Sequence, residues 1–133
     1  MGIKSGTCTS QGTATGCTVS NVYGNYYKIG NMCLVTMEVV VKNNGTSTST
    51  YINIPCLPYK PKRHTTFNIS TCEAVFKANG EDADVSVTMG AYGNSNGIYL
   101  GIWYYGRVYR VTQKELTNTS NASIVFSGIY EIA

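Results

Sequence analysis

The sequence predicts an all-β protein, an antiparallel β-sandwich of jelly-roll type with about eight strands. The 133-residue chain has only 13% charged residues and is rich in Thr, Ser, Asn, Gly and Tyr. Thr and Tyr favour pleated strands, whereas Gly and Asn favour tight turns. Short alternating segments recur every 8–12 residues or so without helical periodicity between them, a spacing typical of sandwiches and barrels.

The chain divides by composition into two parts. Residues 1–17 are rich in Gly, Thr and Ser, and this segment cannot bury enough apolar area to fold alone. We therefore expect it to be a flexible linker or a first edge strand. Residues 18–133 carry the steady strand pattern and form the expected sandwich domain.

Strands are expected at 18–23, 26–29, 32–42, 47–54, 65–78, 84–92, 98–105, 107–111 and 122–133. The clearest is 32–42, where Cys33, Val35, Met37, Val39 and Val41 alternate with more polar residues. The turn sequence at 43–46 contains Asn-Gly, which predicts a hairpin that returns through 47–54.

A bulge is expected in the strand at 65–78, because its apolar residues change parity. Phe67 and Ile69 share one face, whereas Cys72, Ala74 and Phe76 share the other. One extra residue in this strand restores a common buried face.

The five cysteines do not predict a metal site. No pair has CxxC spacing, and the one histidine of the chain, His64, has no obvious companion ligand. We expect no metal and no cofactor. Cys33 is interpreted as a small core residue, and the cysteines as buried free thiols; a Cys8–Cys17 disulfide is the alternative.

The charge and hydropathy patterns exclude several classes of protein. The net charge of +3 is too small and scattered to indicate nucleic-acid binding. No apolar run approaches 18 residues, so no membrane span is expected, and no signal peptide is visible at the start. Neither the seven acidic residues nor His64 falls in a catalytic motif. We expect no catalytic residues and no enzymatic activity.

Several large apolar residues are expected on the solvent-facing side of their strands: Val40, Tyr99, Trp103 and Tyr105. A lone monomer seldom exposes a large apolar patch. Three explanations remain open: identical subunits cover these residues, they form a ligand platform, or a loop of the same chain covers them. The first makes these four residues the candidate oligomer interface.

Four turns are candidate contact loops: Asn43–Ser47, Lys60–His64, Gly93–Gly97 and Thr117–Asn121. Amide and phenol groups can hydrogen-bond sugar hydroxyls, and aromatic rings can stack on sugar C–H faces. The candidate ligand-binding residues are Tyr92, Asn94, Asn96, Lys60, Lys62 and Arg63. The alternative is that the asparagines only form turns and the basic loop is only solvated.

Four segments carry a resemblance to a known group of proteins. They are "SGTCT" at 5–9, "YKIGN" at 27–31, "IPCLPYKP" at 54–61 and "FSGIYE" at 126–131. Together they resemble the C-terminal β-sandwich, or tip, domain of tail fibre, tailspike and appendage proteins of tailed bacteriophages. The departures are Cys8, where Trp is common, and Pro55, where Gly is common.

The resemblance implies a virion component that binds the host surface as a receptor-binding tip domain, a homotrimer assembled in the host cytoplasm and displayed on the tail or a head appendage. Its expected partners are a host cell-surface glycan or protein, and an upstream fibre shaft or other virion proteins. Two alternatives stay open. One is a structural subunit that decorates the capsid or tail without binding a receptor, and the other is a fragment of a polysaccharide depolymerase.

Overall fold

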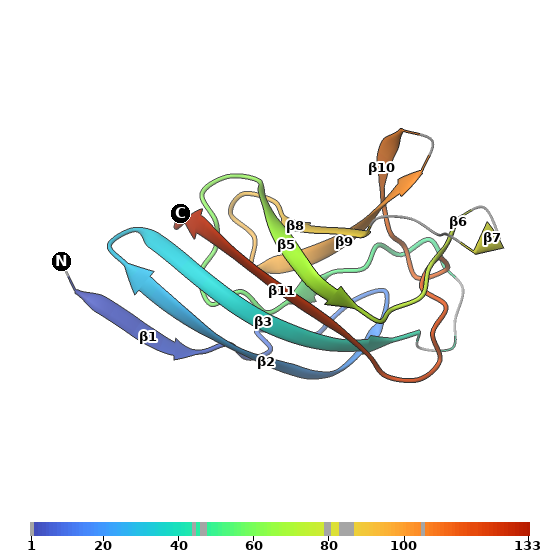
Figure 1. Ribbon diagram of the computed structural model, residues 1–133, viewed down its shortest axis with the longest axis horizontal. Helices are drawn as coiled ribbons and strands as arrows, with labels where there is room; N and C mark the ends of the chain where they lie inside the picture. Colours follow the sequence, from blue (N-terminus) through green and yellow to red (C-terminus); the bar gives the residue numbers. More distant parts are fainter. Residues whose placement is uncertain (1, 44, 46–47, 79–80, 83–86, 105) are drawn as a thin grey trace.

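The computed structural model describes residues 2–43, 45, 48–78, 81–82, 87–104 and 106–133, and its elements are all strands (Figure 1). They are β1 (Ile3–Thr7), β2 (Thr18–Ile29), β3 (Met32–Lys42), β4 (Ile54–Pro55), β5 (Thr65–Cys72), β6 (Lys77–Ala78), β7 (Glu81–Asp82), β8 (Val87–Ala91), β9 (Gly97–Tyr104), β10 (Arg107–Arg110) and β11 (Ala122–Glu131). The described residues contain no helix that is long and apolar enough to cross a membrane. The prediction of an all-β fold is confirmed.

The main sheet is antiparallel and has nine strands in the order β1-β2-β3-β11-β5-β8-β9-β10, with β4 paired to β9. Strands β6 and β7 form a separate hairpin. The layers of the predicted sandwich belong to one curled sheet, because β11 pairs with β3 on one edge and with β5 on the other. The β9–β10 hairpin projects at one end of the molecule, and both termini lie at the opposite end (Figure 1).

The core lies on one face of this curled sheet. In β3 the predicted alternation holds, since Cys33, Val35, Met37, Val39 and Val41 are all buried. The facing strands contribute further apolar side chains to the same cluster, among them Ile54, Met89, Leu100, Ile124 and Phe126. The sequence therefore identified the buried face of the central strand.

The predicted change of parity in the strand that begins at residue 65 is confirmed. In β5, Ile69 lies opposite Phe126 and Thr71 lies opposite Val125, so Ser70 is the extra residue of a bulge. The bulge lets Phe67 and Phe76 both reach the core, although their sequence parity differs. Phe76 lies beyond β5, in an isolated bridge to Leu116.

Two sequence-based expectations about strand pairing are wrong. Segments 18–23 and 26–29 form one strand, β2, because Gly24 continues it at a close backbone approach; a Cβ there would lie 2.4 Å from the Thr36 carbonyl oxygen. In the segment expected at 47–54, the described residues 48–54 do not return along β3, whose two edges are occupied by β2 and β11. Ile54–Pro55 pairs with β9 instead.

The N-terminal segment is attached to the sheet. β1 pairs with β2 along its whole length as an edge strand. The following loop is held by hydrogen bonds from Gln11 N to Pro55 O and between Thr15 and Asn53. Both cysteines of this part, Cys8 and Cys17, are buried.

All five cysteines are free thiols, so the alternative Cys8–Cys17 disulfide is not formed. Burial raises the pKa of the Cys8 thiol to about 11, with a smaller contribution from Cys33, and it raises the pKa of the Cys17 thiol to about 12. Because only the thiolate is a strong nucleophile, these two cysteines are inert near neutral pH.

Neighbouring valines in β3 test which face is buried. Val39 is fully buried and Val40 is only partly buried on the opposite face. We expect Val39→Ala to lower the free energy of unfolding by about 1.5–3 kcal/mol, because it removes buried methyl groups and leaves a cavity. Val40→Ala, the matched control, should cost less than about 1 kcal/mol. Urea unfolding measures both, and equal losses would contradict the assigned faces.

Candidate functional site

Five side chains from different segments meet on the face of β9 that is turned away from the core. They are Tyr51, His64, Tyr92, Tyr99 and Arg110, which we call the aromatic–arginine cluster. The cluster combines three phenol rings, an imidazole and a guanidinium. Such a set offers flat apolar area, hydrogen-bonding groups and a positive charge in one place.

The ends of the strands and their pairing register explain why four of these residues lie close together. His64 directly precedes β5 and Tyr92 directly follows β8, and these two strands pair with each other. Tyr99 lies in β9. Arg110 is the last residue of β10 and lies opposite Gly101, two residues beyond Tyr99, so both side chains project from the same face.

Tyr51 reaches the cluster from the long connection between β3 and β4. Ile52 N donates a hydrogen bond to Val111 O at 3.0 Å, and Tyr51 forms an isolated bridge with Thr112. Ile52 and Val111 are both buried in the core. Core packing of these two neighbours therefore fixes Tyr51 next to Arg110.

Ring contacts connect the tyrosines and the histidine. Tyr92 and Tyr99 are stacked, with ring centres 5.0 Å apart and an interplanar angle of 26°. His64 Nε2 lies 2.6 Å from the Tyr99 hydroxyl oxygen, a hydrogen bond. The Tyr99 ring crosses Gly90 of β8, where a Cβ would lie 2.7 Å from the hydroxyl oxygen. Glycine at position 90 thus allows the ring to lie flat against the sheet.

The tyrosines of the cluster differ in exposure: Tyr99 forms its buried base, and Tyr51 and Tyr92 form its exposed rim. Tyr99 is only 8% exposed, whereas Tyr51 and Tyr92 are 51% and 46% exposed. Burial raises the pKa of Tyr99, as does Tyr92, while Arg110 acts in the opposite direction. The Tyr99 hydroxyl therefore remains protonated at neutral pH and anchors the rim residues.

The structure brings most of the predicted ligand-binding residues near this cluster, but only Tyr92 belongs to it. Asn94 N donates to Pro61 O at 2.6 Å, so the loop after β8 lies against the basic loop that contains Lys60, Lys62 and Arg63. Lys62 is engaged in an exposed ion pair with Glu131 at 3.3 Å. Such a pair is weak and easily broken.

The two predicted asparagines have evident roles in their turn. Asn94 has a positive φ of 62°, a conformation that asparagine tolerates better than most residues. The Asn96 carbonyl oxygen accepts hydrogen bonds from Cys56 N and Leu57 N, each at 3.1 Å. These backbone roles account for both residues without a ligand.

The four predicted interface residues do not form one surface. Tyr99 is buried by its own chain, so the expectation that it faces solvent is wrong, and the alternative of a covering loop holds there. Trp103 is 46% exposed beside Val108 on the β9–β10 hairpin. Val40 lies in β3, separated from β9 by β11, β5 and β8. Tyr105 lies outside the described residues.

A different apolar surface lies near the termini. Tyr27, Leu34 and Ile129 stand side by side across β2, β3 and β11, at 52%, 38% and 57% exposure. Ile3 and Ile29 pair in the adjacent row, at 72% and 39% exposure. We call these five residues the outer apolar patch.

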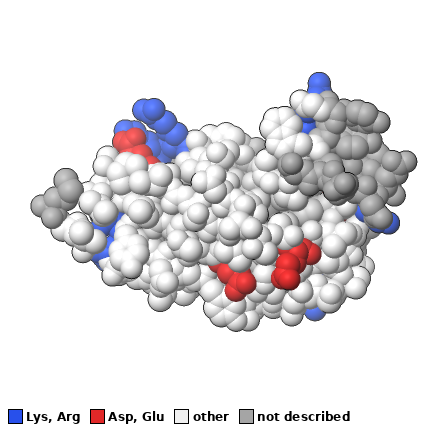
Figure 2. Space-filling view, in the orientation of Figure 1, with Lys and Arg blue, Asp and Glu red and all other residues white. Residues whose placement is uncertain are grey.

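Elsewhere the surface is mostly neutral. Figure 2 shows one face on which Lys, Arg, Asp and Glu occur only in small, separate groups. No three His, Cys, Asp or Glu side chains gather into a possible metal site within the part of the chain that the structure describes.

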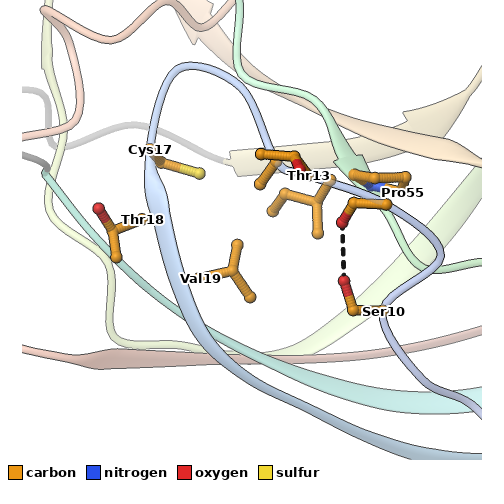
Figure 3. Close-up of a pocket in the computed structure, with 9 residues that line it drawn as sticks. Ser10, Thr13, Cys17, Thr18, Val19 and Pro55 are labelled. Atoms are coloured by element: carbon orange, nitrogen blue, oxygen red, sulfur yellow. Dashed lines mark hydrogen bonds between the residues drawn. The ribbon is translucent and has the colours of Figure 1, made fainter.

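A pocket of about 330 Å³ lies beneath the N-terminal loop (Figure 3). Only uncharged residues line it, including Ser10, Thr13, Cys17, Thr18, Val19 and Pro55. The Ser10 hydroxyl donates to Gly12 O at 2.9 Å, and the high pKa of Cys17 keeps its thiol protonated. The pocket therefore presents hydroxyl, thiol and apolar groups and no charged side chain.

Sequence reasoning missed three members of the cluster. His64 ends the predicted contact loop Lys60–His64 but is not among the predicted ligand-binding residues, and the sequence analysis does not single out Tyr51 or Arg110. The turn at Gly106 could have identified Arg110, because pairing across it places Arg110 opposite Gly101. No local signal predicts the contact between Tyr51 and Arg110, since Tyr51 follows a long loop.

Comparisons with known proteins give one structural match and no sequence match. No family model matches the chain, and no curated protein matches it in sequence. Among solved structures, the chain is similar to the Dettilon tailspike protein (gp208), with a TM-score of 0.71 and 17% identity. The match covers 98% of this chain and 24% of that protein. At this identity the similarity shows a shared fold.

Removing single hydroxyl groups tests the architecture of the cluster. We expect Tyr99→Phe to lower the free energy of unfolding by about 1 kcal/mol, because it removes the buried hydrogen bond to His64. Tyr92→Phe is the control; its ring is half exposed and should cost less than about 0.5 kcal/mol. Thermal unfolding of both variants measures the difference, and an equal effect would refute Tyr99 as the anchor.

Proposed function

We propose that this chain is the receptor-binding domain of a phage tail or appendage protein, and that it binds a host cell-surface glycan without cleaving it. The observation that carries this proposal is the aromatic–arginine cluster, with its two half-exposed tyrosines and its cation. Exposed tyrosine rings offer sugars a flat apolar face and a polar edge.

The fold and the sequence support the same assignment independently. The chain matches part of a tailspike protein along almost its entire length. The resemblance to phage tip domains rests partly on the "YKIGN" and "IPCLPYKP" segments. In this structure these segments form a turn between strands and a buried corner of the fold. Gly30 has a positive φ of 60° between β2 and β3, and Leu57 is buried beyond β4.

A shallow site such as this one suits multivalent recognition. The cluster lies on a sheet face rather than in a deep pocket, so we expect each site to bind weakly. Several copies on one particle raise the effective concentration of the remaining sites once one has bound. A virion that carries these domains would therefore adhere firmly to a cell surface.

We further propose that the domain assembles as a homotrimer, with the outer apolar patch as the contact between copies. Ile3 and Ile129, both more than half exposed, give this face the continuity that marks interaction surfaces. The patch and the cluster lie on different parts of the sheet, so assembly leaves the cluster accessible.

A second candidate function is a structural subunit that only contacts other virion proteins. The outer apolar patch favours it, because an assembly subunit needs such a surface and no receptor site. The two functions differ in one requirement, since only the receptor-binding domain needs the aromatic–arginine cluster. Cell binding therefore separates them.

Cell binding tests the proposed function. We expect the fluorescently labelled chain to bind a subset of strains in a bacterial panel, and excess unlabelled chain to compete. Tyr92→Ala should lower binding about tenfold, because stacking on an aromatic side chain contributes about 1–3 kcal/mol in nucleobase recognition, and we expect a sugar ring face to gain about 1.4 kcal/mol, which is a tenfold change in affinity. Trp103→Ala, a half-exposed aromatic outside the cluster, is the matched control and should bind normally.

If the purified chain binds no cell and no glycan but binds a virion component, the receptor-binding proposal is wrong and the structural one replaces it. Release of reducing ends from a bound polysaccharide would establish a depolymerase instead. These measurements use the same purified chain and strain panel.

Molar mass in solution tests the assembly. We expect about three times the chain mass of 14.4 kDa by sedimentation equilibrium. Ile129→Lys places a charge in the middle of the outer apolar patch and should shift the protein to monomer. Asn21→Lys, on an exposed position of β2 beside Val40, is the control. A wild-type monomer at micromolar concentration would overturn the trimer.

A further inference from the structure

The Arg110 guanidinium lies among three aromatic rings. Its central carbon lies 4.6 Å from the ring centre of Tyr51, 5.4 Å from that of Tyr92 and 5.8 Å from that of Tyr99. Its Nε atom is buried without a hydrogen-bond partner. The rings therefore restrict the orientation of the guanidinium before any ligand arrives.

No carboxylate neutralises this charge in the part of the chain that the structure describes. The ion pair recorded there joins Lys62 and Glu131, not Arg110. Glu115, which follows Arg110 by five residues, hydrogen-bonds to the Thr112 hydroxyl instead. The remaining members of the cluster are phenols and an imidazole, so no acidic side chain among the described residues offsets the charge of Arg110.

A guanidinium that lies among aromatic rings, with no carboxylate partner among the described residues, is well suited to bind an anion. Its planar N–H groups match the geometry of a carboxylate or phosphate, and such charge-assisted hydrogen bonds are about twice as strong as neutral ones. The neighbouring rings partly exclude water, which strengthens the interaction. The half-exposed Tyr51 and Tyr92 adjoin this point and can contact an apolar ring face.

We propose that the aromatic–arginine cluster binds an anionic saccharide, with Arg110 contacting its carboxylate or phosphate group and Tyr51 and Tyr92 contacting the sugar ring. This inference rests on the proposed receptor-binding function and names the chemical class of its ligand. An acidic peptide would satisfy Arg110 but would not require two exposed rings on a shallow surface.

The full-length chain is tested against immobilised bacterial polysaccharides, some with uronic acids, some with phosphate diesters and some neutral, and against polyglutamate. We expect the bound samples to be anionic, and carboxyl reduction of a bound uronic-acid polysaccharide to abolish binding. The uronic-acid and phosphate samples distinguish the two sources of negative charge.

Two arginine variants provide the matched comparison. Arg110→Gln keeps hydrogen-bond donors and removes the charge, so we expect affinity for the bound anionic polysaccharide to fall about tenfold or more. Arg107→Gln, in the same strand with its side chain on the opposite face, should change affinity less than about twofold. If Arg110→Gln fails to fold, Arg110→Lys serves instead, with a smaller loss expected.

Binding of neutral and carboxyl-reduced polysaccharides as tight as binding of anionic ones would overturn this inference and leave the receptor-binding proposal intact. Equal effects of the two arginine substitutions, or polyglutamate binding as tight as polysaccharide binding, would also overturn it. Binding to no polysaccharide and to no cell would overturn both proposals together.

Discussion

Burial of a single face of the curled sheet is the constraint on which the rest of the structure depends. β3 and β11 pair over ten residues and contribute alternate side chains to one core, which also receives the buried residues of β5, β8 and β9. Apolar burial at about 25 cal/mol per Å² makes this cluster the main source of stability. The inner face of the sheet is filled by this core. Large residues whose side chains point to the outer face are therefore either covered by other parts of the molecule or exposed to solvent.

Large side chains on the outer face of the sheet are covered in one region and exposed in another. Tyr99 is covered by His64, Tyr92 and Arg110 of its own chain. The outer apolar patch near the termini has no such cover from the described residues. The first arrangement produces a charged and aromatic surface, and the second leaves an apolar surface exposed. The proposed receptor binding uses the first surface, and the proposed assembly uses the second.

Glycines make the aromatic–arginine cluster possible. Gly90 admits the Tyr99 ring against β8, where any side chain would meet it. A Cβ at Gly101, opposite Arg110, would meet Thr88 and Val108. Because these two glycines have no side chain, neighbouring side chains can lie flat against the outer face of β8 and β9. The cluster therefore depends on the glycines of the sheet as well as on its own five residues.

The sequence by itself determined the fold class, the buried face of β3 and the bulge in β5, because alternation with period two is a local property of a strand. It also singled out Tyr92 and the two adjacent loops as ligand-binding candidates, which stays a prediction. Only the tertiary structure decided that β11, rather than segment 47–54, pairs with β3, and that Tyr51 meets Arg110. Which strand edges meet depends on how the whole chain fills one core, and that choice leaves no trace in the spacing of neighbouring residues.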